Sequence, residues 1–239
     1  MTTIALLPDL LTLTAQAAPA AEAVCDIAKT KLHALVSDEG RVVNLLVEEH
    51  QTAAHGFAWV ATYVESLRHM QNWAEALQAS DRFGEVEQLI HQIAFGEYLC
   101  QLAGGIPMNQ GEIFRLQDIG LTFEDLAPLR AGAPAFLAAS GNTQAARLRL
   151  VTLMQEREAD TMLGASGLDE ELEMIREQFR RYAVEKIEPF AHDWHLKDEL
   201  IPMEVIDELA EMGVFGLTIP EEYGGLGLSK ASMCVVSEE

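Results

Sequence analysis

Apolar side chains recur with a helical period through residues 41–79, and this is the feature that most restricts the fold. A helix of that length is not stable alone, because helical stability in proteins comes mainly from packing of an apolar face. The sequence therefore predicts a helical bundle, in which Gly56 is the one weak helix position. The periodic positions are Val43, Leu46, Val47, His50, Ala54, Phe57, Ala58, Ala61, Val64, Leu67, Met70 and Ala74.

The same periodicity extends to both sides of this stretch. Residues 9–38 predict two helices broken near Pro19, because proline removes a backbone donor and clashes with the preceding turn. Residues 84–105 predict another helix that ends at its two final glycines. The turn between 79 and 84 is short, so the flanking helices are expected to form an antiparallel hairpin.

Further helices follow after a loop at 105–112. Thr122 to Asp125 has the pattern of a helix N-terminus, and Pro128 and Pro134 are expected to flank a short helical piece. A helix begins at Asn142 or Thr143 and is expected to run through residue 163.

The clearest domain boundary is the small-residue stretch GASG at 164–167, which predicts a flexible link between two helix-rich blocks. We predict an all-α chain with two domains, residues 1–165 and 166–239. In the second, Asp169 and Ser229 are expected N-caps, Pro189 interrupts a helix, and Gly213 ends an amphipathic one.

Charge and cysteine usage limit the partners and the compartment. Acidic residues outnumber basic ones by 38 to 16, a net charge of −22 that repels nucleic acids and anionic membranes. The chain has no apolar run of about 18 residues. Its three cysteines lack CxxC spacing and its start lacks a basic region, so we expect a cytoplasmic protein with reduced thiols.

The glycine-rich stretch LTIPEEYGGLGLS at 217–229 raises the question of phosphate binding. A dinucleotide fingerprint needs GxGxxG directly after a buried strand, and a P-loop ends in GK[ST]. Neither pattern is present, and Glu221 and Glu222 would repel a phosphate. The residues favour a tight turn that needs positive φ angles.

Residues 168–239 resemble the amino-terminal helical domain of the acyl-CoA dehydrogenases. The resemblance lies in the order of an arginine-rich helix running into EKIEPFAHDWH, the link KDELIP, the segment MGVFGLTIPEEYGGLGLS and a helix ending in SEE. Residues 1–165 resemble the additional amino-terminal helical region found in one branch of that family, chiefly in HQTAAHGFAWVATYVESLRHMQNWAEAL and FGEYLCQLAGGIPMNQGE.

The resemblance implies FAD, an acyl-CoA substrate oxidised between its α and β carbons, electron-transferring flavoprotein as electron acceptor, and homo-oligomers. It also implies that most flavin contacts and the catalytic base lie outside these residues. We therefore assign no catalytic, cofactor-binding or metal-binding residue here, Glu238 and Glu239 of the SEE motif included. These 239 residues are expected to be inactive alone and to form the amino-terminal part of a longer enzyme.

Other reactive side chains have structural explanations. Glu65 with His69, and Glu87 with His91, are spaced i,i+4 on two helices and raise the possibility of a metal site in the bundle. The Glu-x-x-His pattern of di-metal bundles does not occur, so partly buried or surface histidines are expected. His192 and His195 are expected to flank a packing Trp194.

The remaining candidates are expected in the core or on solvated faces. We expect Cys100 and Cys234 to be buried, inert thiols. Core packing is also expected for Met70, Met154, Met174, Met212, Trp59 and Trp73. A solvated face is expected for Glu170, Glu171, Glu173 and Glu177.

Three alternatives stay open. One is a related flavoprotein oxidase or monooxygenase on the same scaffold. Another is that residues 1–165 form an interaction or oligomerisation module without chemistry. The third is the metal site between the helices.

Overall fold

The computed structural model describes residues 5–157 and 163–239, and it separates into two compact units. Unit 1 is Met1–Gly167 and unit 2 is Leu168–Glu239. Helices make up nearly all of the regular structure in both, which confirms the all-α prediction. Separately folding domains divided at residues 165 and 166 stay a prediction.

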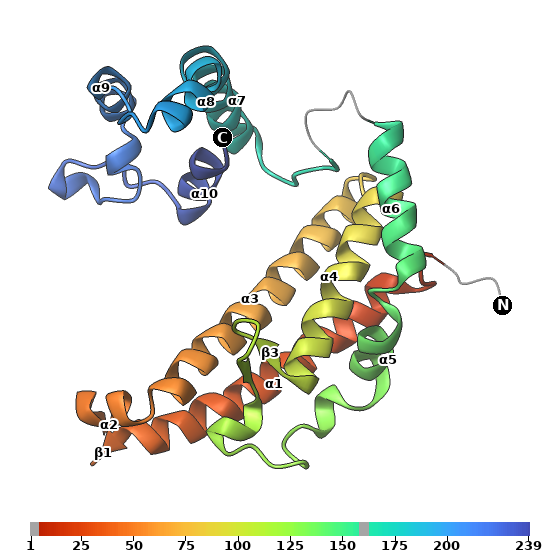
Figure 1. Cartoon of the computed structure of the whole chain (residues 1–239). Coiled ribbons are helices and arrows are strands. Elements are labelled where there is room, and N and C mark those ends of the chain that lie inside the picture. The colour runs from red at the N-terminus through yellow and green to blue at the C-terminus, as the bar shows by residue number, and fades with distance from the viewer. Residues whose placement is uncertain (1–4, 158–162) are drawn as a thin grey trace. The chain divides into compact units, whose positions relative to one another are not determined.

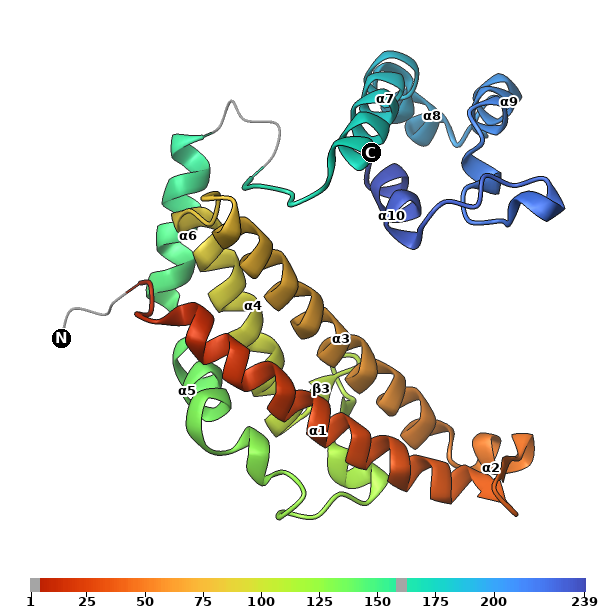
Figure 2. The same cartoon turned by 180° about the vertical axis from the view of Figure 1, so that it is seen from behind.

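Three long helices lie side by side in unit 1 and form its main layer (Figures 1 and 2). They are α1 (Leu10–Val36), α3 (Gln51–Ala79) and α4 (Glu85–Gly104). A turn of five residues joins α3 to α4, and the two helices contact each other, as the predicted hairpin requires. Two shorter helices, α5 (Gly132–Ser140) and α6 (Gln144–Glu156), pack against α4.

The predicted break at Pro19 is wrong, because α1 continues through it. Pro19 and Ala15, whose carbonyl faces the proline ring one turn earlier, are both on the exposed side of the helix. Water can therefore satisfy the freed carbonyl there. The opposite side, with Ala17, Ala18 and Ala21, is buried against neighbouring helices, and this packing offsets the cost of about 3 kcal/mol for an internal proline.

The stretch predicted as one helix over 41–79 is divided at His50. An antiparallel hairpin of β1 (Ser37–Asp38) and β2 (Arg41–Val42) comes first, turning at Glu39 and Gly40, which both have positive φ. The short α2 (Asn44–Glu49) follows. His50 leaves helical geometry with φ −104° and ψ 28°, and α3 begins after it. Periodicity continues across the break, which is why the pattern alone does not reveal it.

Residues 105–143 contain short elements that pack on α1, α3 and α4. The predicted loop at 105–112 contains half of a second antiparallel hairpin, and Pro128 and Pro134 lie inside helical elements and do not flank one. At Thr122 the hydroxyl and the Asp125 carboxylate each accept the other residue's backbone N–H, as at a helix N-terminus. The predicted helix is nevertheless wrong, because residues 123–126 form turns and the next helical element begins only at Ala127. The elements are β3 (Ile106–Pro107), β4 (Ile113–Phe114), η1 (Leu116–Ile119) and η2 (Ala127–Leu129).

The core of unit 1 is continuous across α1, α3, α4 and α5. Its largest fully buried side chains include Phe95, Leu67, Leu99 and Leu137. The buried Gln92 amide joins three segments: its Oε1 accepts from Leu7 N at 2.7 Å, and its Nε2 donates to the carbonyls of residues 5 and 141 at 2.9 and 3.0 Å. The chain before α1 is thereby fastened to α4. The Thr143 hydroxyl caps α6 by accepting from Ala146 N.

Unit 2 is a succession of helices joined by tight turns. Asp169 and Ser229 cap their helices as predicted, accepting the N–H of Leu172 and Ser232. Pro189 stands in the first turn of a new helix, so the predicted interruption is confirmed. The elements are α7 (Glu170–Lys186), α8 (Glu188–Lys197), α9 (Met203–Glu211), η3 (Val214–Gly216), η4 (Glu221–Tyr223) and α10 (Lys230–Glu238).

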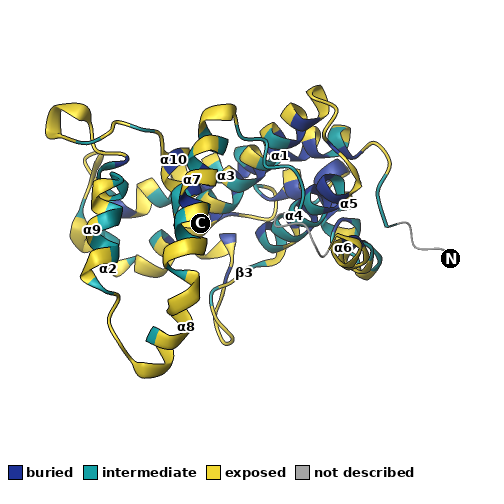
Figure 3. Cartoon of the chain, turned by 90° about the horizontal axis from the view of Figure 1, so that it is seen from above, coloured by how far each residue is buried: buried dark blue, intermediate teal, exposed yellow. Residues whose placement is uncertain are grey.

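Unit 2 buries little of its apolar surface. Phe179, Leu217 and Val235 are its three buried hydrophobic residues, and α8 and α9 bury none of theirs. Figure 3 shows α8 almost wholly exposed, whereas α4 and α5 of unit 1 carry many buried positions. Large apolar side chains are exposed along the unit, with Leu200 at 91% and Leu196 at 68%. Such a surface is typical of a unit that packs against further protein.

Candidate functional site

The glycine-rich loop of unit 2 uses its backbone donors internally. The N–H groups of residues 224 to 228 donate to carbonyls within 216–221. Three of these bonds close the loop: Leu226 N to Gly216 O at 2.9 Å, Gly227 N to Ile219 O at 2.8 Å, and Leu228 N to Leu217 O at 2.7 Å. A phosphate cradle needs these donors free and convergent on the ligand. The loop therefore does not fit a phosphate group.

Glycine is required in this loop for two different reasons. Gly224 and Gly227 have φ angles of 84° and 62°, in the left-handed region, which confirms the predicted tight turn. Gly225 is required by packing, since an added Cβ there would lie 2.1 Å from the carbonyl oxygen of Ile219. The loop is a compact structural turn held by its own backbone.

An arginine–glutamate cluster ties the first and last helices of unit 2. Arg176 is 8% exposed; its Nη2 lies 3.2 Å from Glu238 Oε2 and its Nε 3.5 Å from Glu239 Oε1. Arg180 donates to both Glu239 oxygens at 2.9 and 2.6 Å, and this hydrogen bonding raises the pKa of Arg180. The SEE motif therefore ends in carboxylates that neutralise arginines and hold α10 on α7.

An apolar cavity of about 320 Å³ lies between α8 and α9. Trp194 and His195 line it from α8, Val205 and Leu209 from α9, and Glu199 from the link between them. The Trp194 ring stacks on Phe190 at 5.9 Å between centroids. The predicted packing role of Trp194 holds in that stack, while His195 faces the cavity and not only the solvent.

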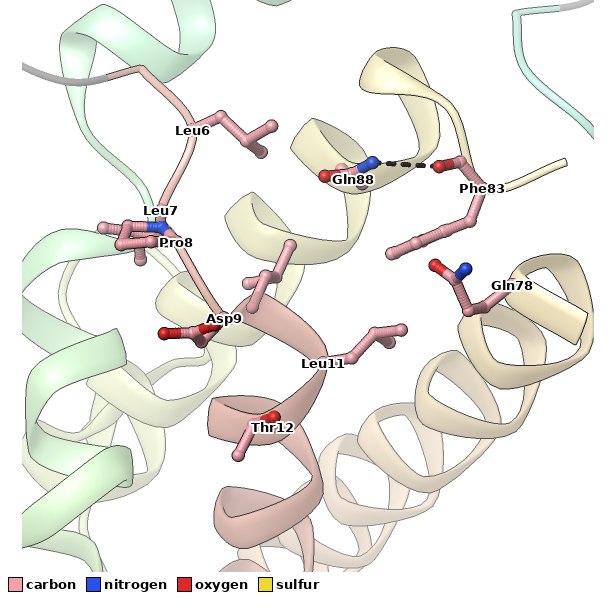
Figure 4. A pocket seen from close by; sticks show the side chains of 10 residues that line it. Leu6, Leu7, Pro8, Asp9, Leu11, Thr12, Gln78, Phe83 and Gln88 are labelled. Atoms are coloured by element: carbon pink, nitrogen blue, oxygen red, sulfur yellow. Dashed lines mark hydrogen bonds between the residues drawn. The ribbon is translucent and has the colours of Figure 1, made fainter. Parts of the chain in front are cut away.

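A second cavity of about 550 Å³ lies on unit 1 where α1 begins (Figure 4). Leu6, Leu11 and Phe83 supply its apolar walls, and Gln78 and Gln88 its polar rim. Gln88 is not available to a ligand through its amide N–H, because its Nε2 donates to the carbonyl of Phe83 at 2.9 Å. The opening is broad and carries no convergent set of reactive groups on the described residues.

The two glutamate–histidine pairs have different surroundings and do not meet. Glu65 and His69 are exposed, with 3.3 Å between Oε1 and Nε2. Glu87 and His91 are buried, which the sequence did not indicate, and neither bonds to the other: Glu87 Oε1 accepts from Ala165 N, and His91 contacts Thr14. Among residues 5–157 and 163–239, no three histidine, cysteine or acidic side chains gather closely enough to hold a metal ion.

His91 is a buried, uncharged imidazole. The Thr14 hydroxyl donates to a carbonyl one turn earlier in α1, so it accepts from His91 Nε2 at 3.0 Å. Nδ1 then carries a lone pair, and it has no hydrogen-bond partner. The rings of Trp73, Phe83 and Phe95 lie around the imidazole. Desolvation lowers the pKa of His91 from 6.5 to about 4.

Several predicted placements are wrong. Cys100 and Cys234 are exposed, because each is one residue off the buried side of its helix, next to Leu99 and Val235. Met154 and Met174 are 47% and 67% exposed, and Trp59 is 41% exposed. Core or partly buried packing holds for Met70, Met212 and Trp73. Of the four glutamates expected on a solvated face of α7, Glu173 is half-buried beside Arg176.

Sequence patterns do not predict the arginine–glutamate cluster. Arg176 and Arg180 are four apart on α7, a spacing that places both on one side of a helix. That spacing was the available signal, but the partners lie about sixty residues away, beyond the reach of any local pattern. The described helices include none whose length and hydropathy would suit a membrane span.

Known proteins match this chain in two ways. Residues 169–239 match the family model described as acyl-CoA dehydrogenase, N-terminal domain. Over all 239 residues, the chain is 57% identical to a (2S)-methylsuccinyl-CoA dehydrogenase of Cereibacter sphaeroides, of which it covers 43%.

Two further relatives match over shorter stretches. A glutaryl-CoA dehydrogenase of Desulfococcus multivorans is 36% identical over 75 residues, which is 30% of this chain and 19% of that protein. A mitochondrial isobutyryl-CoA dehydrogenase of Dictyostelium discoideum is 36% identical over 72 residues, 30% of this chain and 17% of that protein. The chain thus spans less than half the length of each of these relatives.

Proposed function

We propose that the chain is part of an FAD-dependent acyl-CoA dehydrogenase, because residues 169–239 match the N-terminal domain of that family. The reaction would be oxidation of the Cα–Cβ bond of an acyl-CoA thioester. The substrate we propose is (2S)-methylsuccinyl-CoA, converted to mesaconyl-CoA in the ethylmalonyl-CoA pathway. The observation that carries this choice is 57% identity extending over unit 1 as well as unit 2.

The exposed apolar surface of unit 2 supports a place in a larger enzyme. A 72-residue unit with three buried hydrophobic side chains has too small a core to be expected to stand alone. Phe190 and Leu196 of α8 are exposed, as is Leu200 in the link that follows it. We propose that further parts of the enzyme cover this surface.

The glycine-rich loop at 217–229 does not fit the pyrophosphate of FAD. The loop donors at 224–228 are used, and Glu221 and Glu222 stand beside them. The flavin, which would supply the acceptor for the substrate's hydride, is therefore proposed to bind chiefly to residues outside this chain, as is the base that removes the α proton. No catalytic, cofactor-binding or metal-binding residue is proposed within residues 1–239.

The contribution of unit 2 is then a structural one. The arginine–glutamate cluster holds α10 to α7, and the glycine loop fixes the path between α9 and α10. Together they would present the apolar side of α8 and α9 to the rest of the enzyme in one conformation. Electron-transferring flavoprotein and further copies of the chain are proposed as partners. A cytoplasmic location belongs to the same proposal, supported by three unpaired cysteines.

Two other functions would use the same scaffold. A flavoprotein oxidase or monooxygenase would pass electrons to oxygen, and a change in the base outside this chain would distinguish it. In the second alternative unit 1 is an oligomerisation module, which the exposed Trp59, Phe136 and Leu148 on its helices favour.

The test uses the full-length natural protein, purified without added flavin. We expect a bound-flavin absorption spectrum, bleaching of that spectrum by (2S)-methylsuccinyl-CoA, and turnover with an artificial electron acceptor that exceeds turnover with butyryl-CoA. A colourless protein would contradict the whole proposal. A flavoprotein that is bleached by another acyl-CoA but not by methylsuccinyl-CoA would contradict the substrate alone. Turnover with oxygen alone, accompanied by peroxide, would favour the oxidase.

The 239-residue chain provides a matched control. We expect it to be colourless and without turnover under the same conditions. A second comparison removes residues 1–165 from the full-length protein. Loss of the oligomer with turnover retained would assign unit 1 to assembly, whereas loss of methylsuccinyl-CoA turnover with the oligomer intact would tie unit 1 to the substrate.

A further inference from the structure

The small residues at the end of unit 1 are held against α3 and α4 through the backbone N–H and the carbonyl of one residue. Ala165 donates its N–H to Glu87 Oε1 at 2.8 Å, and its carbonyl accepts from Trp73 Nε1 at 3.1 Å. Trp73 belongs to α3 and Glu87 to α4, so one residue bridges both helices of the hairpin. The sequence predicts a flexible separator here, and the structure corrects that prediction.

Packing on either side of Ala165 agrees with these hydrogen bonds. Leu163 packs on the cluster of Val86, Leu89 and Leu153, and Ala165 packs beside Ala74 and Leu77. Residues 163–168 are all half-buried. Gly167 has a φ of 75°, and an added Cβ would lie 2.8 Å from Trp73 Cδ1. Small residues are thus needed here for close approach to the indole.

The two side chains that hold Ala165 are themselves fixed. Glu87 is 6% exposed, and a carboxylate is seldom buried without a partner. The Ala165 N–H is such a partner for Glu87 Oε1. The Trp73 ring meets Phe83 edge-on at 6.1 Å and lies 6.4 Å from the buried His91 ring. A buried carboxylate and an oriented indole therefore bind the backbone of this segment, independently of its side chains.

We propose that residues 163–167 are a strap fastened to α3 and α4 by Trp73 and Glu87, so that they move with these two helices. The strap fixes on unit 1 the point from which unit 2 departs. This inference does not depend on the proposed substrate.

The test compares amide hydrogen exchange of the strap in the whole 239-residue chain and four variants. Glu87→Met removes the acceptor and keeps the length of the side chain, whereas Glu87→Gln keeps an acceptor oxygen. Trp73→Phe removes the donor and keeps an aromatic ring, and Trp59→Phe makes the same change at an exposed position of α3. Exchange in α3 and α4 reports whether each variant is folded.

We expect the strap amides of the wild-type chain to exchange much more slowly than those of an unstructured peptide. Exchange should be about tenfold faster in Glu87→Met and Trp73→Phe, the size expected for one lost hydrogen bond, and near wild type in Glu87→Gln and Trp59→Phe. Cleavage by elastase, which cuts after small residues, should follow the same order. Wild-type exchange as fast as in a free peptide would overturn the strap even if a variant fails to fold, and so would equal rates in all five proteins.

Discussion

The ring of Phe114 occupies the space that a side chain at Gly56 would fill. A Cβ added to Gly56 would lie 2.1 Å from Phe114 Cδ2 and Cε2. Phe114 belongs to the hairpin after α4 and is 3% exposed, so the hairpin is seated on α3 through this contact. Glycine at position 56 weakens the helix but leaves room for the Phe114 ring of the β3–β4 hairpin to pack on α3.

Gly56→Ala is expected to destabilise the chain by about 2 kcal/mol in denaturant unfolding. The added methyl forces the Phe114 ring out of its place, at a cost typical of overpacked cores. The gain in helix propensity from glycine to alanine, about 1 kcal/mol, acts in the opposite direction and is the smaller effect.

Gly104→Ala is the matched control for that change. Gly104 is also helical, and an added Cβ there would meet nothing within 4 Å. Only the propensity gain remains, so stability should stay unchanged or rise by up to about 1 kcal/mol. Equal effects of the two substitutions would refute the packing role of Gly56.

The sequence was sufficient for the helices and for most of their ends. Periodicity located the hairpin of α3 and α4, and side-chain chemistry located the caps at Thr143, Asp169 and Ser229, because both signals are local. Pro19 and His50 show where local reasoning fails. Tertiary packing carries one helix through a proline, and a backbone turn divides another within an unbroken apolar pattern.

Burial was harder to predict than helix position. A shift of one residue turns a helical side chain by 100°, so Cys100 and Leu99 differ completely in exposure although both looked apolar. The pairing of Arg176 with Glu239 and the fastening of Ala165 by Glu87 join residues far apart in sequence. Such contacts are set by how helices assemble, which no spacing within a helix encodes.

The burial of His91 predicts a loss of stability as the pH falls from about 6.5 to 4. The unfolded chain takes up a proton at this imidazole near pH 6.5, whereas the folded chain, with a pKa of about 4, does not. Because the unfolded state binds more protons in this window, the free energy of unfolding decreases by about 1.4 kcal/mol per pH unit, to a total near 3 kcal/mol.

Carboxylates titrate in the same window, so the measurement needs a difference between variants. His91→Gln retains an amide donor for Thr14 and cannot be protonated, so the dependence of its stability on pH between 6.5 and 4 should be weaker than that of the wild type. Parallel curves for wild type and His91→Gln would show that His91 is not kept neutral by the fold.

Arg176→Met is expected to destabilise unit 2 by about 3 kcal/mol. The substitution leaves the Glu239 carboxylate, which is 8% exposed, with Arg180 as its remaining arginine, and loss of one partner from a buried ion pair costs several kcal/mol. Amide exchange in α10 should increase while exchange in α4 of unit 1 stays constant. Arg181→Met, at the neighbouring exposed position, should change stability by less than about 0.5 kcal/mol. A similar effect of both substitutions would mean that the cluster does not hold α10.

The glycine loop gives a prediction in which two adjacent glycines respond differently. Gly225→Ala places a methyl 2.1 Å from the Ile219 carbonyl oxygen, which is backbone and cannot rotate away. The loop must open and give up bonds such as Leu226 N to Gly216 O, so we expect a loss of about 3 kcal/mol and faster amide exchange over 213–228.

At Gly224 an added Cβ would meet nothing within 4 Å, and only the φ of 84° resists substitution. Asparagine tolerates that left-handed conformation better than other residues, so Gly224→Asn should cost about 1 kcal/mol or less. The two substitutions differ in cost because they meet different obstacles. At Gly225 the obstacle is a steric clash, and at Gly224 it is the backbone conformation. If Gly225→Ala were tolerated as well as Gly224→Asn, the loop would have room to move, and its amide donors would no longer be committed to holding it closed.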